Sequence, residues 1–166
     1  MLGPPDRHHL TAAIGWLELG NHSEAGEEIG RISPENLDDP DVLEARWQVC
    51  AAGGSWDAAL GAAEKLIEVA PDRVAAWLHR AYALRRSSNG GLQPAAEALR
   101  PAFDKFPQAA LVPYNLACYA SQLGQLDAAM DWLKHAMKRS DKAGTIKEMA
   151  LADEDLRPLR KLIAAL

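Results

Sequence analysis

Histidine and cysteine are the residue types of this 166-residue chain that most often carry catalysis or bind metal ions. The five histidines show neither the HExxH spacing nor a pairing with cysteine that would hold zinc. Cys50 and Cys118 are 68 residues apart and form no CxxC pair, so we expect two reduced, partly buried thiols in a reducing compartment. No GxSxG, phosphate-loop or paired-carboxylate motif is present. The sequence therefore predicts no enzymatic activity, no bound metal and no cofactor.

Tyrosine and arginine offer a different chemistry, the recognition of a partner. Tyr82, Arg85 and Arg86 have a spacing that places them on one face of a helix, as have Tyr114 and Gln122. Both residue types are enriched at binding hot spots, where tyrosine offers apolar area and arginine holds carboxylates in a fork. This pattern favours an acidic peptide as ligand. In the alternative interpretation, Arg85 and Arg86 are solvated and stabilise the end of their helix through its dipole.

Paired amphipathic helices must position these side chains. Residues 114–137 predict two helices with apolar residues at the i, i+3, i+4, i+7 spacing and a small residue in the middle of each contact face. The small residue of the second helix recurs at separations of 34, 36 and 34 residues: Ala25, Ala59, Ala95 and Ala129. A fixed period of this length indicates stacked repeats, whose close helix crossings require small side chains. An ordinary alanine-rich bundle needs no such period.

Glycine and proline occur in phase with this alanine. In three copies, a glycine precedes the alanine by five residues, at the predicted break between the helices: Gly20, Gly54 and Gly124. In the remaining copy the break is SSNGG at residues 87–91, which accounts for the two additional residues. Pro71 and Pro107 follow second helices, where proline stops the hydrogen-bond ladder. Pro101 is expected inside the second helix of the third copy.

In this spacing, and in the sequences WLELGNHSEA, AAGGSWDAALGAAEKLIEVAP, AWLHRAYAL and YNLACYASQLGQLDAA, the chain resembles the tetratricopeptide repeat (TPR) family, bacterial type. The resemblance implies an all-α fold, a right-handed superhelix (α-solenoid) of four helix–turn–helix units in a single domain over residues 1–166. We expect repeats at 6–39, 40–73, 74–109 and 110–143, and a C-terminal cap at 144–166. The second copy departs from the pattern because Trp47 stands where the other copies have alanine.

The resemblance also implies a binding surface. In that family the concave face of the first helices binds peptides, and here this groove would be lined by residues of three copies: Gln48, His79, Tyr82, Arg85, Arg86, Tyr114, Asn115 and Gln122. We therefore expect a non-catalytic protein- or peptide-binding scaffold or adaptor whose ligand is extended or helical and carries acidic residues. A clamp for acidic C-terminal peptides is not implied, because Leu10 and Ile14 stand where it needs lysine and asparagine.

Charge and hydropathy set limits on other functions. Eighteen lysines and arginines against 23 acidic residues give a net charge of −5, which disfavours binding to nucleic acid. A nucleic-acid-binding helical repeat would need a basic stripe, which Glu18, Asp41 and Glu44 interrupt. A small acidic secretion-type chaperone stays an alternative.

The start, MLGPPDRHHL, has no apolar segment after its charges, and no apolar run approaches the roughly 18 residues of a membrane span. We expect a cytoplasmic protein without membrane contact.

The last residues predict a capping element. Asp153 is an expected N-cap, followed by acidic residues in the first turn, where the helix dipole favours anions. The following apolar residues keep a helical spacing: Leu156, Leu159, Ile163 and Leu166. Stacked repeats end in atypical elements that cover the last stacking face, and dimerisation is the alternative role of such a helix.

Overall fold

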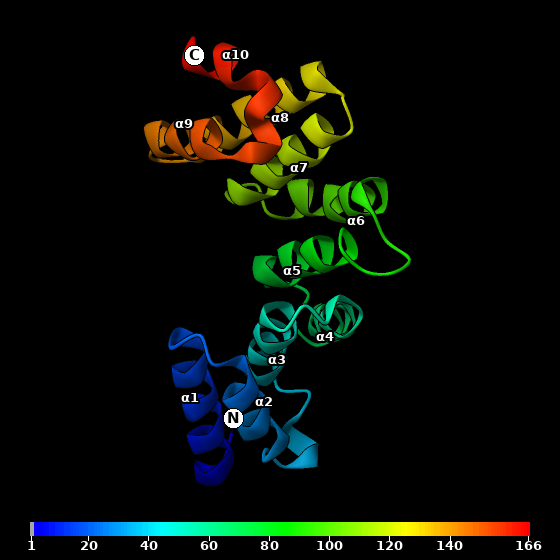
Figure 1. The fold of residues 1–166 in the computed structure, drawn as a ribbon, viewed down its shortest axis with the longest axis vertical. Helices are drawn as coiled ribbons and strands as arrows, with labels where there is room; N and C mark the ends of the chain where they lie inside the picture. Colours follow the sequence, from blue (N-terminus) through cyan, green and yellow to red (C-terminus); the bar gives the residue numbers. More distant parts are fainter. Residues whose placement is uncertain (1) are drawn as a thin grey trace. The chain divides into compact units, whose positions relative to one another are not determined.

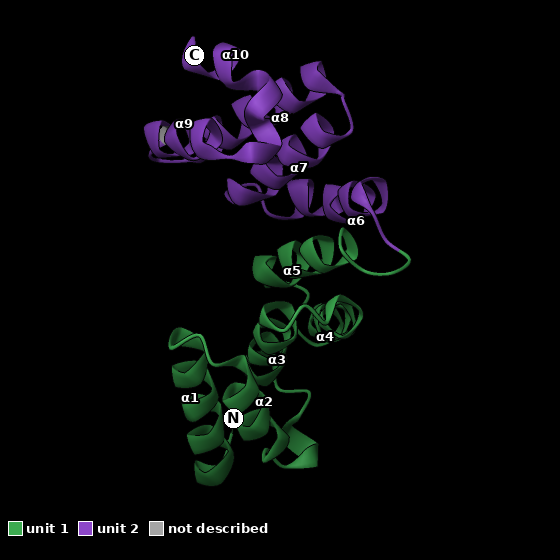
Figure 2. Ribbon diagram, in the orientation of Figure 1, with its two compact units in different colours: residues 1–89 green, residues 90–166 purple. Residues whose placement is uncertain are grey.

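The computed structural model describes residues 2–166, and within this range all regular secondary structure is helical (Figure 1). The predicted all-α fold is confirmed. The chain divides into two compact units, residues 1–89 (unit 1) and residues 90–166 (unit 2), which Figure 2 shows in different colours. That the chain forms a single domain stays a prediction.

Unit 1 contains the helices α1 (Pro4–Glu18), α2 (His22–Gly30), η1 (Pro34–Asn36), α3 (Pro40–Ala52), α4 (Trp56–Val69) and α5 (Val74–Leu84). Here α1 packs against α2 and α3, and α3 packs against α4 and α5. Unit 2 contains α6 (Leu92–Lys105), α7 (Leu111–Gln122), α8 (Leu126–Arg139), α9 (Ala143–Ala152), η2 (Glu154–Leu159) and α10 (Arg160–Ala164). In this unit α7 packs against α6, α8 and η2, and α9 packs against α8 and α10.

The periodic alanines lie in the interior. The alanine of each second helix has a relative exposure of 0%: Ala25, Ala59, Ala95 and Ala129. Three alanines of the first helices are equally buried: Ala13, Ala81 and Ala117. A methyl group at these positions lets the two helices of a pair approach closely. The predicted position of these alanines in the buried contact face is confirmed.

The breaks between paired helices lie where the sequence predicts them, and glycine is required there by the backbone. Gly20, Gly54 and Gly124 have φ angles of 76°, 72° and 75°, in the left-handed region that favours glycine. The amide one residue later returns to a carbonyl of the preceding helix, as in Gln125 N to Ala120 O at 2.9 Å. This is the Schellman arrangement, which satisfies a carbonyl at the helix end.

The C-terminal segment confirms one prediction and corrects another. Asp153 is the N-cap of η2, and its carboxylate accepts a hydrogen bond from Asp155 N at 2.9 Å. The helix that follows is divided into η2 and α10, because Pro158 interrupts the hydrogen-bond ladder that a continuous α-helix needs. Leu156 and Leu159 are fully buried, whereas Leu166, which the spacing placed on the same face, is 49% exposed.

A buried carboxylate holds the end of the first repeat. Asp6 on α1 is only 4% exposed and accepts hydrogen bonds from Ser33 N and Ser33 Oγ, both at 3.0 Å, and from Asn36 Nδ2 at 2.6 Å. These bonds join α1 to η1 and to the residue before it. The Ser33 amide and the Asn36 side chain lower the pKa of Asp6 from its ordinary value of 3.8.

Overpacking tests the helix crossing. Ala129→Leu should lower the free energy of unfolding by about 1–3 kcal/mol, because the added carbons have no space between α7 and α8. The matched control is Ala128→Leu, one residue away on the exposed side of α8. Urea titration monitored by circular dichroism measures both. Equal stability of the two variants would show that the crossing is not tightly packed.

Asp6 predicts an acid sensitivity. Ionised Asp6 contributes stability above its ordinary pKa of 3.8, and this contribution is lost as the pH falls toward the lowered pKa of the folded state. Asp6→Asn should therefore be less stable at neutral pH and lose less stability between about pH 5 and pH 3 than the unmodified chain. Urea titrations at several pH values give the free energy of unfolding as a function of pH for each protein, with Asp141→Asn as a control at an exposed site. The same pH dependence for Asp6→Asn and the unmodified chain would contradict this role.

Candidate functional site

A hollow on unit 1 lies between α1 and α3, the first helices of the first two repeats. It has a volume of about 270 Å³ and is lined by Leu10 and Ile14 of α1 and by residues of α3: Asp41, Glu44, Ala45 and Gln48. Ile14 is 42% exposed, which leaves an apolar floor open to a ligand. The predicted groove residue Gln48 is exposed at this hollow.

The carboxylates of the hollow lie next to two basic groups, Arg73 before α5 and His79 on α5. Arg73 Nη1 lies 2.7 Å from Asp41 Oδ1 and 3.4 Å from Glu44 Oε2. The hydrogen bond from Arg73 to Asp41 raises the pKa of the arginine, so the guanidinium stays charged. His79 Nε2 is 3.8 Å from Glu44 Oε1, too far for a hydrogen bond. Burial lowers the pKa of His79, and the Glu44 carboxylate only partly opposes this shift.

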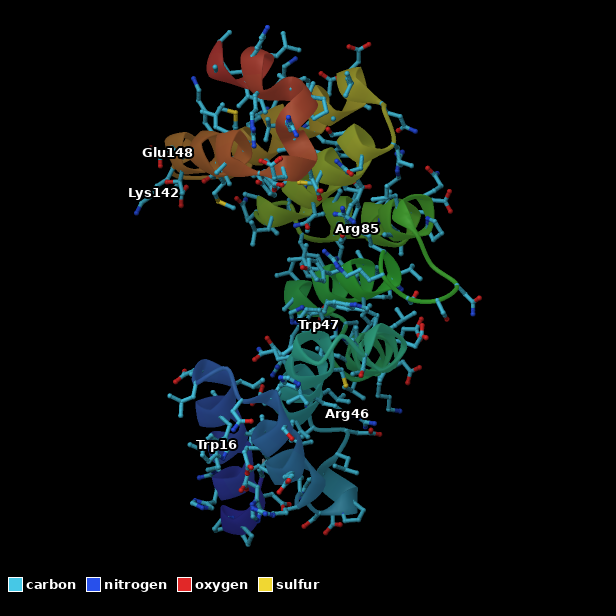
Figure 3. All side chains as sticks on the ribbon, in the orientation of Figure 1. Trp16, Arg46, Trp47, Arg85, Lys142 and Glu148 are labelled. Atoms are coloured by element: carbon cyan, nitrogen blue, oxygen red, sulfur yellow. The ribbon has the colours of Figure 1, made fainter. Side chains whose placement is uncertain are left out.

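Aromatic side chains continue the surface from Glu44 toward the end of α5. The Trp47 and His79 rings are stacked, with centroids 3.8 Å apart and an interplanar angle of 15°. Tyr82 meets Trp47 edge to face at 6.1 Å and lies 5.8 Å from Trp56. Trp47, labelled on α3 in Figure 3, thus occupies the space of the usual alanine by stacking on the neighbouring helix.

Arg86 completes this cluster. Its guanidinium carbon lies 3.6 Å from the centroid of the Tyr82 ring and 5.2 Å from that of Trp56, and its Nη1 donates to the Tyr82 carbonyl at 3.1 Å. Cation–π contacts of this kind hold the guanidinium in place. Arg85 is the C-cap residue of α5 and is partly buried. We call the connected surface of Leu10, Ile14, Asp41, Glu44, Gln48, His79, Tyr82 and Arg86 the unit 1 face.

The predicted groove residues of the fourth copy belong to unit 2, and there the chain's own C-terminal segment contacts Tyr114 and Gln122. Tyr114 Oη donates to Asp153 Oδ2 at 2.8 Å, and Cys118 Sγ lies 3.6 Å from the same oxygen. Gln122 Nε2 donates to the Asp155 carbonyl at 3.2 Å. Tyr114 is only 7% exposed, and burial together with the bond to Asp153 raises its pKa. Asn115 Nδ2 donates to the Leu111 carbonyl of its own helix.

The sequence pattern places Tyr114 and Gln122 on one helical face but does not connect that face to the C-terminal segment. The i, i+4, i+8 spacing was the available signal for the face. The partner lies 39 residues from Tyr114, and no local pattern indicates a contact over that distance.

One group of side chains in residues 2–166 has the ligand types of a metal site. Cys118, Asp153 and Asp155 bring their ligand atoms within 4.8 Å of one another. Both Asp153 oxygens already accept hydrogen bonds, one from Tyr114 and the other from the Asp155 amide. These bonds account for the arrangement as a junction between α7 and η2.

Comparison with known proteins identifies the fold. No protein-family model matches the chain, and no curated protein matches it. Among solved structures, TTC0263, described as a thermophilic TPR protein in Thermus thermophilus, is 21% identical, with a TM-score of 0.68 over 97% of this chain and 100% of that one. The chain has the tetratricopeptide-repeat fold.

Two further structures support this assignment of the TPR fold. MamA (residue 41 to the end) from Desulfovibrio magneticus RS-1 is 17% identical, with a TM-score of 0.71 over 99% of this chain and 92% of that one. MamA of strain AMB-1 is 19% identical, with a TM-score of 0.66 over 97% and 91%. In the described part of the chain, no helix has both the length and the apolar character to cross a bilayer.

The junction between α7 and η2 predicts a stability effect. Tyr114→Phe should lower the free energy of unfolding by about 1–2 kcal/mol, because it removes a buried hydrogen bond to a carboxylate. Tyr82→Phe is the matched control, since the Tyr82 hydroxyl is on a 39% exposed side chain and makes no hydrogen bond within the described residues. Urea titration measures both variants. Equal losses in the two variants would contradict the assigned role of the Tyr114 hydroxyl.

Proposed function

We propose that the chain is a non-catalytic protein-binding scaffold whose unit 1 face holds a peptide segment of a partner. One observation carries this proposal: in unit 2, the corresponding face of α7 already holds a peptide segment, residues 153–155 of the chain itself. Side chains of α7 bind that segment through a carboxylate and a backbone carbonyl, which are features any acidic peptide offers.

The open state of the unit 1 face supports its use by another molecule. Tyr82 is 39% exposed and Ile14 42% exposed, whereas Tyr114 under the C-terminal segment is 7% exposed. Partly exposed apolar and aromatic side chains next to charged groups are typical of a surface that binds a protein. The TPR fold supports the same conclusion, because its stacked first helices present one continuous row of side chains.

The chemistry of the face suggests how a ligand would lie. An apolar side chain would enter the hollow over Leu10 and Ile14. An acidic side chain would meet Arg86, which Tyr82 and Trp56 hold in a fixed orientation. The carboxylates of Asp41 and Glu44 repel an acidic ligand. This repulsion is reduced because Arg73 binds both carboxylates. We therefore propose a peptide with an apolar residue and an acidic residue as the ligand class.

Site-specific photocrosslinking tests this function in extract of the native cell. A benzophenone amino acid at Gln48 on the unit 1 face should capture a defined partner, whereas the same group at the exposed Glu68 of α4 should not. Combining the Gln48 probe with Tyr82→Ala and Arg86→Glu should reduce capture about tenfold or more, as expected for the loss of two hot-spot residues.

Circular dichroism must show that the double variant keeps its helix content. Equal capture from positions 48 and 68, or undiminished capture by a folded double variant, would contradict binding at the unit 1 face.

A further inference from the structure

A second hollow on unit 1 lies between α2 and α3 and shares no lining residue with the unit 1 face. It has a volume of about 350 Å³ and is lined by Gly26, Ile29, Gly30, Leu37, Arg46, Val49 and Cys50. The apolar side chains form its floor, and one cation, the exposed Arg46, stands at its edge. No acidic residue is part of this lining.

Two glycines of α2 create this hollow. Gly26 and Gly30 are four residues apart and therefore lie on the same side of the helix. Neither has a positive φ, and a Cβ on Gly30 would meet nothing within 4 Å. A Cβ on Gly26 would make an ordinary contact with Val49 Cγ1 at 3.4 Å. Glycine weakens the helix interior at Gly26, and the backbone requires glycine at neither position, so the missing side chains have their effect in the space they leave.

The next repeat carries side chains at the positions that correspond to these glycines. In the register of the buried alanines, Gly26 and Gly30 of α2 correspond to Leu60 and Glu64 of α4. Across from them, Arg46 of α3 corresponds to Arg80 of α5.

Between α4 and α5, the arginine at this position, Arg80, has an acidic residue of the same chain close to it. Burial lowers the pKa of Arg80, and the nearby Glu64 carboxylate opposes the shift. The Arg46 guanidinium, labelled on α3 in Figure 3, has no carboxylate partner in residues 2–166. Compared with the next repeat, the hollow between α2 and α3 therefore lacks two neighbouring groups, a leucine side chain and a carboxylate.

We propose that this hollow binds a small apolar carboxylic acid, whose branched aliphatic body lies over Gly26 and Gly30 and whose carboxylate meets Arg46. The volume is at the lower end of the roughly 300–1,000 Å³ of small-molecule sites, which matches a short acid. Arginine holds a carboxylate with two parallel hydrogen bonds, so the charged group is favoured over a neutral amide of the same shape.

Cys50 provides the readout, because its thiol lines the hollow and is partly exposed. In a Cys118→Ser background it is the single thiol of the chain. The probe is 5-methylhexanoate, and the matched neutral probe is 5-methylhexanamide. At ten times its dissociation constant, the acid should slow the reaction of Cys50 with N-ethylmaleimide about tenfold, because only the free protein reacts. The amide at the same concentration should slow it much less.

Two variants test the chemistry of the site. Arg46→Gln should abolish the difference between acid and amide. Gly30→Glu supplies the missing carboxylate within the chain and should abolish protection by the acid. Tyr82→Ala with Arg86→Glu should leave protection unchanged, which separates this site from the unit 1 face. Failure of the acid to protect Cys50, equal protection by acid and amide, or undiminished acid protection in folded Arg46→Gln would each overturn the proposal.

Discussion

The close approach of paired helices, permitted by a buried methyl group at each crossing, is the constraint on which the rest of this structure depends. A larger side chain at Ala25, Ala59, Ala95 or Ala129 would separate the two helices of a pair, since each of these residues has no exposed surface. Close crossing fixes which side of each first helix is buried. The remaining side must then carry whatever the protein uses for recognition.

The side of the first helices that is not buried at the crossing differs between the two units. On α7 it is occupied by the start of η2, where Tyr114 and Cys118 meet Asp153. In unit 1 it bears a hollow, a network of charges around Glu44 and a stacked aromatic cluster around Tyr82. The same geometry thus serves stability in one unit and, in our proposal, partner binding in the other. Internal docking on α7 also shows that a short polar segment satisfies such a face.

Much of the fold follows from local patterns, and much of the site does not. The glycines with positive φ and the Asp153 cap depend on residues within one or two helical turns, and the buried alanines recur at a fixed period, so the sequence predicts all three. The bonds of Asp6 to Ser33 and of Tyr114 to Asp153 join residues 27 and 39 positions apart. Such contacts depend on how neighbouring elements pack, which periodicity does not specify.

The contact that Trp47 makes is also one that the sequence does not predict. A tryptophan at the alanine position departs from the repeat pattern, and the sequence offers no means to place its ring. The structure accommodates it through His79, whose ring stacks on the indole and whose pKa is lowered by burial. The sequence predicts His79 as a groove residue that faces a ligand, yet the Trp47 ring covers much of its surface. Its role on the unit 1 face is therefore to support Trp47, which in turn contacts Tyr82.

Hydroxyl-radical footprinting of the free chain tests most directly whether one face is filled and the other open. Tyr82 and Tyr114 have the same intrinsic reactivity toward the radical, so their oxidation rates compare the exposure of the two rings. The structure predicts rapid oxidation of Tyr82, which is 39% exposed, and strong protection of Tyr114, which is 7% exposed. Similar rates for the two tyrosines would contradict the account, because the C-terminal segment would then not occupy the face of α7.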